Sequence, residues 1–320
     1  MAEDTPVQPQ RSQRVDRSGI ALVFVLVVLF SYSEEIIAGI VTVAGKPEVS
    51  WWRWLVVLFD IVIIAATGLL KRRIAAADGD GNRLWGWWAA GACLALAVDL
   101  VLLAVGDVIT VWGDLVASTL FVVAMGMLLI SALNGDPETV LSPARRRARP
   151  PDWIRARSVV PLIVGTYVGY VAAAIWSDVL DTDVMRTLDT AKAAEIFSLP
   201  LADQLPVLAQ LCSGAVNPHL FAQMSTVIPL LLVALGIESG YFRSSFREPA
   251  QRAATITTVS LLCIGLVLAL SAVVKSGNGC GNILTGWHEY LAFVVSVQAS
   301  AIGLVTLVWL LVVNSRPDDE

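Results

Sequence analysis

Long apolar stretches separated by short polar ones dominate the pattern of this chain. Each stretch is close to the length of about 20 residues that a helix needs to cross the hydrocarbon core of a bilayer. Because unpaired backbone groups are costly in lipid, such stretches are expected to be helices. Only Gly106 and Asp107 separate the third stretch from the fourth, which predicts a tight helical hairpin. The pattern predicts eight spanning helices, at residues 18–43, 53–70, 85–105, 108–133, 159–177, 226–242, 253–274 and 287–313.

The positive charges divide unevenly between the predicted loops. When the N-terminus is placed in the cytoplasm, 17 of the 22 Lys and Arg residues fall on the cytoplasmic side. Lys and Arg are retained on that side of a membrane, so both termini are predicted to be cytoplasmic. The 11 Trp residues all fall near predicted helix ends, at the headgroup level that their amphipathic rings prefer. The predicted fold class is therefore an all-α membrane protein, a polytopic bundle of eight transmembrane helices.

The composition agrees with this pattern and excludes other classes of protein. Hydrophobic residues make up 56% of the chain and charged residues 15%, whereas a soluble domain has about 25% charged residues. No large basic domain is present, so a nucleic-acid partner is not expected. No Walker loop, dinucleotide fingerprint or HExxH motif occurs, so we expect neither an enzyme nor a cofactor or metal.

The polar segments divide the chain into two predicted membrane halves, a loop between them and a tail at each end. The longest cytoplasmic loop joins two four-helix halves and contains the run Arg145-Arg146-Arg147-Ala148-Arg149. This run either sets the topology or contacts anionic lipid or a partner. The predicted parts are a disordered tail at 1–17, membrane halves at 18–133 and 158–314, the basic loop at 134–157, and a cytoplasmic tail at 315–320.

The extracytoplasmic segment 178–224 carries apolar residues at helical spacing over 185–197 and 201–211. We expect two short amphipathic helices there, which either cap a vestibule or pack on the outer helix ends.

Two cysteines are predicted to lie in outer loops. Cys212 and Cys280 fall on the side where an oxidising exterior permits a disulfide between them. A zinc site that adds His219 and His288 is an alternative with poor spacing, and two unpaired thiols are another. Cys93 and Cys263 fall inside spans, where cysteine commonly serves as a small packing residue.

Acidic residues inside the predicted spans carry the most functional information. Such a residue costs about 2.5–3.5 kcal/mol on insertion scales and is a functional candidate by default. Glycine and alanine accompany them, since Gly91, Ala95 and Asp99 share one face of the third span. The candidates for a proton or cation relay lie at similar outer depth in four consecutive spans and are Glu34, Glu35, Asp60, Asp99 and Asp114.

Two readings of these acids remain open. In the first, they line a cavity, and the protein is a proton- or cation-linked transporter or channel of the plasma or inner cell membrane. In the second, they snorkel or accept hydrogen bonds in a static bundle, Asp60 pairs with Arg53, and the protein is a scaffold, sensor or assembly subunit. An intramembrane enzyme acting on lipid-linked substrates ranks below both. The expected partners are the lipid bilayer, a proton or small cation, and membrane subunits or further copies of the chain.

Overall fold

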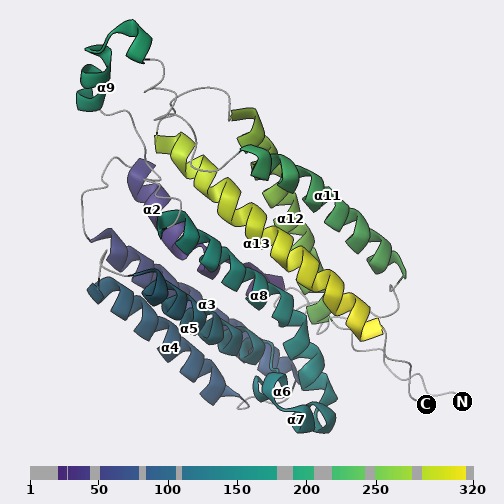
Figure 1. Cartoon of the computed structure of the whole chain (residues 1–320). Helices are drawn as coiled ribbons and strands as arrows, with labels where there is room; N and C mark the ends of the chain where they lie inside the picture. Colours follow the sequence, from purple (N-terminus) through teal and green to yellow (C-terminus); the bar gives the residue numbers. More distant parts are fainter. Residues whose placement is uncertain are drawn as a thin grey trace, which may run out of the picture. The chain divides into compact units, whose positions relative to one another are not determined.

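The computed structural model describes most of the chain, and its regular secondary structure there is helical (Figure 1). The described residues fall within two compact units. The first unit covers Met1–Val108, Thr119–Ile163 and Ser244–Thr257, and the second covers Ile109–Ser118, Val164–Arg243 and Thr258–Glu320. The described ranges are 21–26, 28–43, 51–78, 84–105, 110–178, 190–204, 218–241, 249–275 and 283–314.

Seven helices among the described residues are long and apolar enough to cross a membrane. Two further segments, Ala21–Ser31 and Ser33–Val41, pass the same test together but are bent by 58° at their junction. The predicted all-α polytopic bundle is thus confirmed, with an eighth span where the bent pair counts as one. The seven are α3 (Trp52–Asp78), α4 (Trp85–Val105), α5 (Val111–Ala132), α8 (Pro150–Asp178), α11 (Pro218–Tyr241), α12 (Pro249–Lys275) and α13 (Ile283–Asn314).

Several helices are longer than the apolar pattern predicts. The helix α3 continues past residue 70 through Lys71, Arg72 and Arg73, and α8 begins at Pro150 rather than at residue 159. Long basic side chains extend along apolar surface while their charge stays in polar surroundings, so they do not end a helix at the membrane boundary. Charge therefore marks the edge of the bilayer better than it marks the end of a helix.

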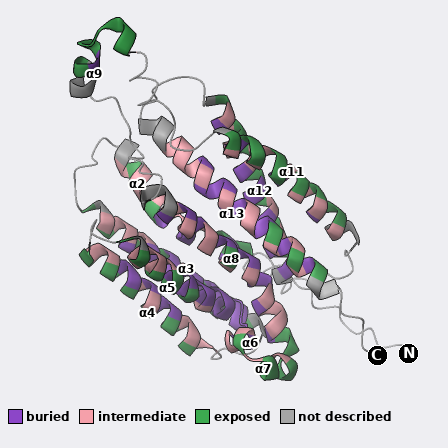
Figure 2. Ribbon diagram, in the orientation of Figure 1, coloured by how far each residue is buried: buried purple, intermediate pink, exposed green. Residues whose placement is uncertain are grey.

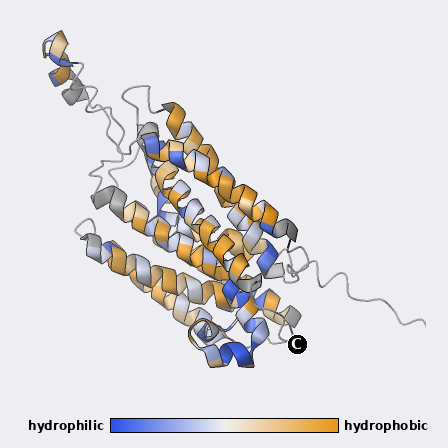
Figure 3. Cartoon of the chain, turned by 45° about the vertical axis from the view of Figure 1, so that its right-hand side comes forward, coloured by the Kyte–Doolittle hydropathy of each residue, from blue (hydrophilic) through white to orange (hydrophobic). Residues whose placement is uncertain are grey.

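Large apolar side chains cover much of the outer surface. Leu69, Leu230 and Ile256 are among the most exposed, and Figure 3 shows hydrophobic residues along the long helices. Over residues 219–238 of α11 a narrow stripe is buried, at Phe221, Ile228 and Leu235, while the other positions in that range are exposed or half-buried (Figure 2). Apolar surface of this extent is unfavourable in water and favourable against lipid tails. The chain is a multi-pass integral membrane protein.

Helix packing in the first unit is close enough to bring backbones into contact. The helix α3 packs against both α4 and α2 (Ser33–Val43). A Cβ atom built at Gly91 of α4 would lie 2.8 Å from the Ala124 carbonyl oxygen of α5. Small residues allow this approach, which drives helix association in membranes by van der Waals contact. Phe30 and Phe121 stack with their ring centroids 4.8 Å apart in the same unit.

In the second unit, α13 packs against three helices. Gly165 and Gly169 of α8 lie directly against Ile302 and Gln298 of α13. Gln298 donates to the Thr166 hydroxyl of α8 at 3.2 Å. Similar polar and small contacts connect α13 to α12, where Thr258 and Thr306 share a hydrogen bond of 3.3 Å, and α11 also packs against α13.

A fully buried lysine closes the C-terminal end of α5. Lys71 of α3 donates from Nζ to the carbonyl oxygen of Ser131 at 2.7 Å and lies 5.4 Å from the centroid of the Trp85 ring. A cation at this position complements the partial negative charge of a helix C-terminus. The sequence pattern assigns Lys71 only to the basic loop that sets orientation, so its structural role was not predicted.

Replacing Lys71 with methionine is expected to lower the free energy of unfolding by about 1–3 kcal/mol, because the Ser131 carbonyl would lose a buried charged donor. Denaturant unfolding in detergent measures this change. Arg72→Met is the matched control, because Arg72 is the exposed neighbour on the same helix. Equal stability of the two variants would contradict the assigned role of Lys71.

Candidate functional site

A break in the first span creates one wall of the candidate site. The helical segment Ala21–Ser31 ends before Tyr32, and α2 begins at Ser33 with Glu34 and Glu35 in its first turn. Serine and acidic residues are favoured there, since they complement the free N–H groups and the positive end of the helix dipole. The prediction of one continuous helix over residues 18–43 is therefore wrong in detail: the polar run Ser31–Glu35 starts a new helix at an angle of 58°.

The centre of the site is a pair of carboxyl groups on α3 and α4. Asp60 is 1% exposed and Asp99 is 9% exposed, and the two carboxyl groups lie close enough to act on each other. The Ser33 hydroxyl at the start of α2 donates to Asp60. Three neighbouring helices thus each place one polar side chain at the same point of the first unit.

The local sequence explains why these two acids meet. On α4 the buried residues include Gly91, Ala95 and Asp99, at the helical spacing that the sequence predicts. The small side chains of Gly91 and Ala95 let α4 approach its neighbours closely. The helix α3 is one of the helices that α4 contacts. The small-residue face of α4, which at Gly91 packs on α5, therefore turns Asp99 into the interior of the unit.

The pair is not fully satisfied by protein groups. Within the described part of the chain, Oδ1 of Asp60 and Oδ2 of Asp99 are buried and have no hydrogen-bond partner. A buried acceptor without a partner loses the free energy of desolvation, about 1–3 kcal/mol and more for a charged group. Such an arrangement is stable only when something else compensates, and a proton or a bound cation can do so.

The other predicted acids occupy different positions. Glu34 is exposed, and its charge acts on both Asp60 and Asp99. Glu35 is half-buried and acts on Tyr32. The first turn of α5 contains Asp114, which belongs to the second unit. The structure therefore brings together Asp60 and Asp99, with Ser33 as an additional polar group and Glu34 near enough for its charge to act on both.

The predictions about metal and disulfide sites can be compared with the structure only where their residues are described. Among the described residues, no three His, Cys, Asp or Glu side chains are grouped closely enough to hold a metal ion. Both Cys212 and Cys280 lie outside the described residues, so their disulfide stays a prediction. His288 is engaged with the Ser271 hydroxyl at 2.7 Å. Cys93 and Cys263 are free thiols at exposed positions.

The outer segment is helical over most of its described residues, apart from a turn at 198–200. Of the first predicted amphipathic helix, residues 190–197 are described and form α9 (Thr190–Phe197). Residues 201–204 of the second predicted helix are helical, and the Gln204 side chain donates to the Leu199 carbonyl at 2.7 Å. Residues 205–211 of that prediction lie outside the described residues.

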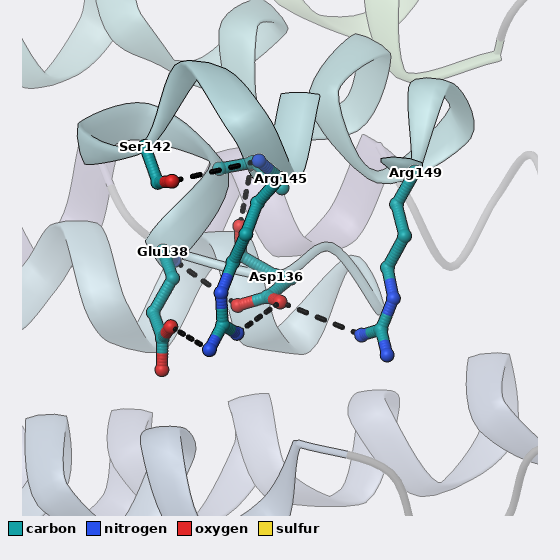
Figure 4. A network of polar contacts seen from close by, with 6 residues as sticks. Asp136, Glu138, Ser142, Arg145 and Arg149 are labelled. Atoms are coloured by element: carbon teal, nitrogen blue, oxygen red, sulfur yellow. Dashed lines mark hydrogen bonds and ion pairs between the residues drawn. The ribbon is translucent and has the colours of Figure 1, made fainter. Parts of the chain in front are cut away.

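The basic loop is a folded cap rather than an extended linker. Its helices are α6 (Glu138–Leu141) and α7 (Pro143–Ala148). Figure 4 shows Asp136 between Arg145 and Arg149, whose Nη1 atoms lie 3.4 and 3.5 Å from its Oδ2 atom. The other oxygen of Asp136 accepts from the Glu138 backbone N–H at 3.0 Å. The sequence pattern singled out the arginines and missed this buried carboxylate, which organises them.

No protein-family model, no curated protein and no solved structure matches this chain. The chemistry of the site is therefore inferred from its own geometry. A buried carboxyl pair with free oxygens can bind and release a small positive charge, and intramembrane acids commonly mark ion or proton pathways.

Proposed function

We propose that this chain is a transporter or channel of the plasma or inner cell membrane that moves protons or small cations. The binding site in this proposal is the Asp60–Asp99 pair, with Glu34 adding negative charge from the exposed side. The observation that supports it most is the buried, unpartnered oxygen on each carboxyl group. Burial of a carboxylate in the membrane interior costs free energy. A purely structural role gives no reason for its oxygens to lack hydrogen-bond donors.

The broken first span adds support from an independent feature. Discontinuous helices, with their half-helix ends at the binding site, are usual in secondary transporters. Here the break lies at Tyr32, and the first residue after it, Ser33, is hydrogen-bonded to Asp60. A change in the angle between the two segments would therefore move a direct partner of the site.

The alternative function is a non-transporting scaffold, sensor or assembly subunit, and the α6–α7 cap favours it. Leu141 at the end of α6 is 86% exposed, and Arg147 on α7 is also exposed. An apolar side chain beside arginines is typical of a contact with another protein or with further copies of the chain. In that reading the carboxyl pair is a structural contact between α3 and α4.

Ion flux in liposomes separates the two functions. Purified protein is reconstituted, gradients of H⁺, Na⁺ and K⁺ are imposed in turn, and flux is compared with that of protein carrying Asp99→Asn. The transport proposal predicts flux for at least one ion and its loss in the variant. No flux under any of these gradients, together with co-purification of a membrane partner that Leu141→Asp abolishes, would favour the scaffold.

A further inference from the structure

The segment that joins α5 to α8 is held at a membrane surface by its two neighbours. The apolar part of α5 ends at Ala132 and that of α8 begins at Pro150, and both helices are long and apolar enough to cross a membrane. Residues 133–149 therefore stay close to the hydrocarbon boundary. The cap that they form, α6 and α7, belongs to the same compact unit as the adjoining ends of both helices. Its surroundings include lipid headgroups.

Arg145 holds the cap together and does not offer its charge to a ligand. Its Nη2 atom lies 2.5 Å from Oε2 of Glu138, and its Nη1 atom lies 3.4 Å from Oδ2 of Asp136. These ion pairs join α7 to the beginning of α6 (Figure 4). Because two carboxylates face this one guanidinium group, Arg145 adds little to the positive potential around the cap.

Arg146 ties the cap to the first turn of α8. Its Nε atom donates to the Thr139 carbonyl at 2.8 Å, and its Nη2 atom donates to the Val140 carbonyl. Its guanidinium carbon lies 4.3 Å from the centroid of the Trp153 ring, which is a cation–π contact. Tryptophan prefers the headgroup level of a bilayer. Contact with this ring therefore places α7 at the same level.

Two further arginines direct positive charge away from the cap. Arg147 is exposed, and its side chain makes no ion pair or hydrogen bond within the described residues. The side chain of Arg149 is 54% exposed, and its ion pair in that part of the chain runs through Nη1, 3.5 Å from Oδ2 of Asp136. That carboxylate is shared with Arg145. Residues 133–149 contain four arginines and two acidic residues, so the cap carries an excess of positive charge.

We propose that the basic cap surface, formed by Arg147, Arg149 and Leu141, binds anionic phospholipid headgroups of the adjacent leaflet. A guanidinium group matches a phosphate in charge and geometry, and basic clusters beside a spanning helix attract anionic lipid. Leu141 is 86% exposed, and its side chain adds an apolar contact at the boundary between headgroups and acyl chains.

Anionic lipid fits the basic cap surface better than the protein partner of the alternative function does. The chain itself holds the cap beside the bilayer, so lipid surrounds it in every molecule, whereas a protein would have to be recruited. The excess of arginine also complements a phosphate without needing a matching arrangement of acidic side chains. The proposal is independent of ion transport, since none of its residues belongs to the candidate ion site.

Native mass spectrometry of the full-length protein in a neutral detergent tests the basic cap surface. The probes are dioleoyl-phosphatidylglycerol, which is anionic, and dioleoyl-phosphatidylcholine, which has the same acyl chains and no net charge. Each arginine is expected to strengthen phosphatidylglycerol binding about fivefold, so Arg147→Gln/Arg149→Gln should weaken it about 25-fold. Binding of phosphatidylcholine should not change.

Two further variants separate this effect from unfolding and from net charge. Arg147→Gln alone removes none of the contacts of the cap within the described residues, and it should weaken phosphatidylglycerol binding about fivefold. Arg72→Gln/Arg73→Gln changes the net charge by the same amount as the cap double variant, at exposed positions of α3 outside the cap. This control should bind phosphatidylglycerol as the wild type does.

Three results would overturn the proposal. The first is equal binding of phosphatidylglycerol by the wild type and the cap double variant. The second is an equal loss in Arg72→Gln/Arg73→Gln, because the attraction would then depend on net charge and not on the cap. The third is unchanged lipid binding in the cap double variant together with loss of a membrane protein that co-purifies with the wild type, which would make this surface a protein interface.

Discussion

Liposomes that contain the Asp60→Asn or the Asp99→Asn protein are expected to show only the ion leak of protein-free liposomes. Asparagine matches aspartate in shape but cannot exchange a proton or carry a negative charge. Since both acids contribute to one site on α3 and α4, either replacement should remove the flux. The measurement is the initial rate of flux under an imposed gradient, at equal protein density.

Glu238→Gln is the matched control for this prediction. It also neutralises an acid in a spanning helix, but Glu238 lies near the end of α11 in the second unit. Its flux should equal that of the wild type, and all three variants should unfold at similar temperatures. Wild-type flux in both aspartate variants would show that the pair is not the pathway.

Gly165→Ala is expected to destabilise the protein by about 3 kcal/mol, the upper end for overpacking in a close-packed interior. An ideal Cβ at this position would overlap the Cγ1 atom of Ile302, far inside van der Waals contact. Either α8 or α13 must move to accommodate it. Denaturant unfolding in detergent measures the loss of stability.

Two comparisons make this prediction specific. A Cβ at Gly236 of α11 would meet nothing within 4 Å, so Gly236→Ala should be neutral or stabilising by up to about 1 kcal/mol. Adding Ile302→Ala to Gly165→Ala should restore part of the lost stability, because it removes the atoms that the new methyl group meets. Equal effects of the Gly165 and Gly236 substitutions would show that the contact with Ile302 is not close in solution.

The helical type of the spans and the positions of seven of them could be predicted, because both depend on where long apolar stretches lie along the chain. An apolar stretch of sufficient length must be helical in lipid, whatever its neighbours are. The predicted helix ends were less accurate, because α3 continues through Lys71–Arg73 and α8 already begins at Pro150, both beyond the apolar stretch. The break at Tyr32 was missed because its signal, a serine and acidic run inside an apolar stretch, also fits a continuous helix with a polar face.

The candidate site was only partly predictable for a different reason. The spacing on one helix predicts which residues share a face, as it did for Gly91, Ala95 and Asp99. It does not predict which face of α3 meets that face, so the pairing of Asp60 with Asp99 needed the structure. Lys71 was missed because its partner is a backbone carbonyl, that of Ser131, which the pattern of residue types does not indicate. Asp136 was missed because its partners are the arginines of the cap, which lie outside any apolar pattern.

The most direct test of the central claim is the charge displaced by a pH jump across protein adsorbed on a solid-supported membrane. If the Asp60–Asp99 pair is a proton site on a transport pathway, a jump should displace charge in the wild type without Na⁺ or K⁺ present. The double variant Asp60→Asn/Asp99→Asn should displace none. Equal displacement by the two proteins would contradict the account, because proton movement would then not involve this pair.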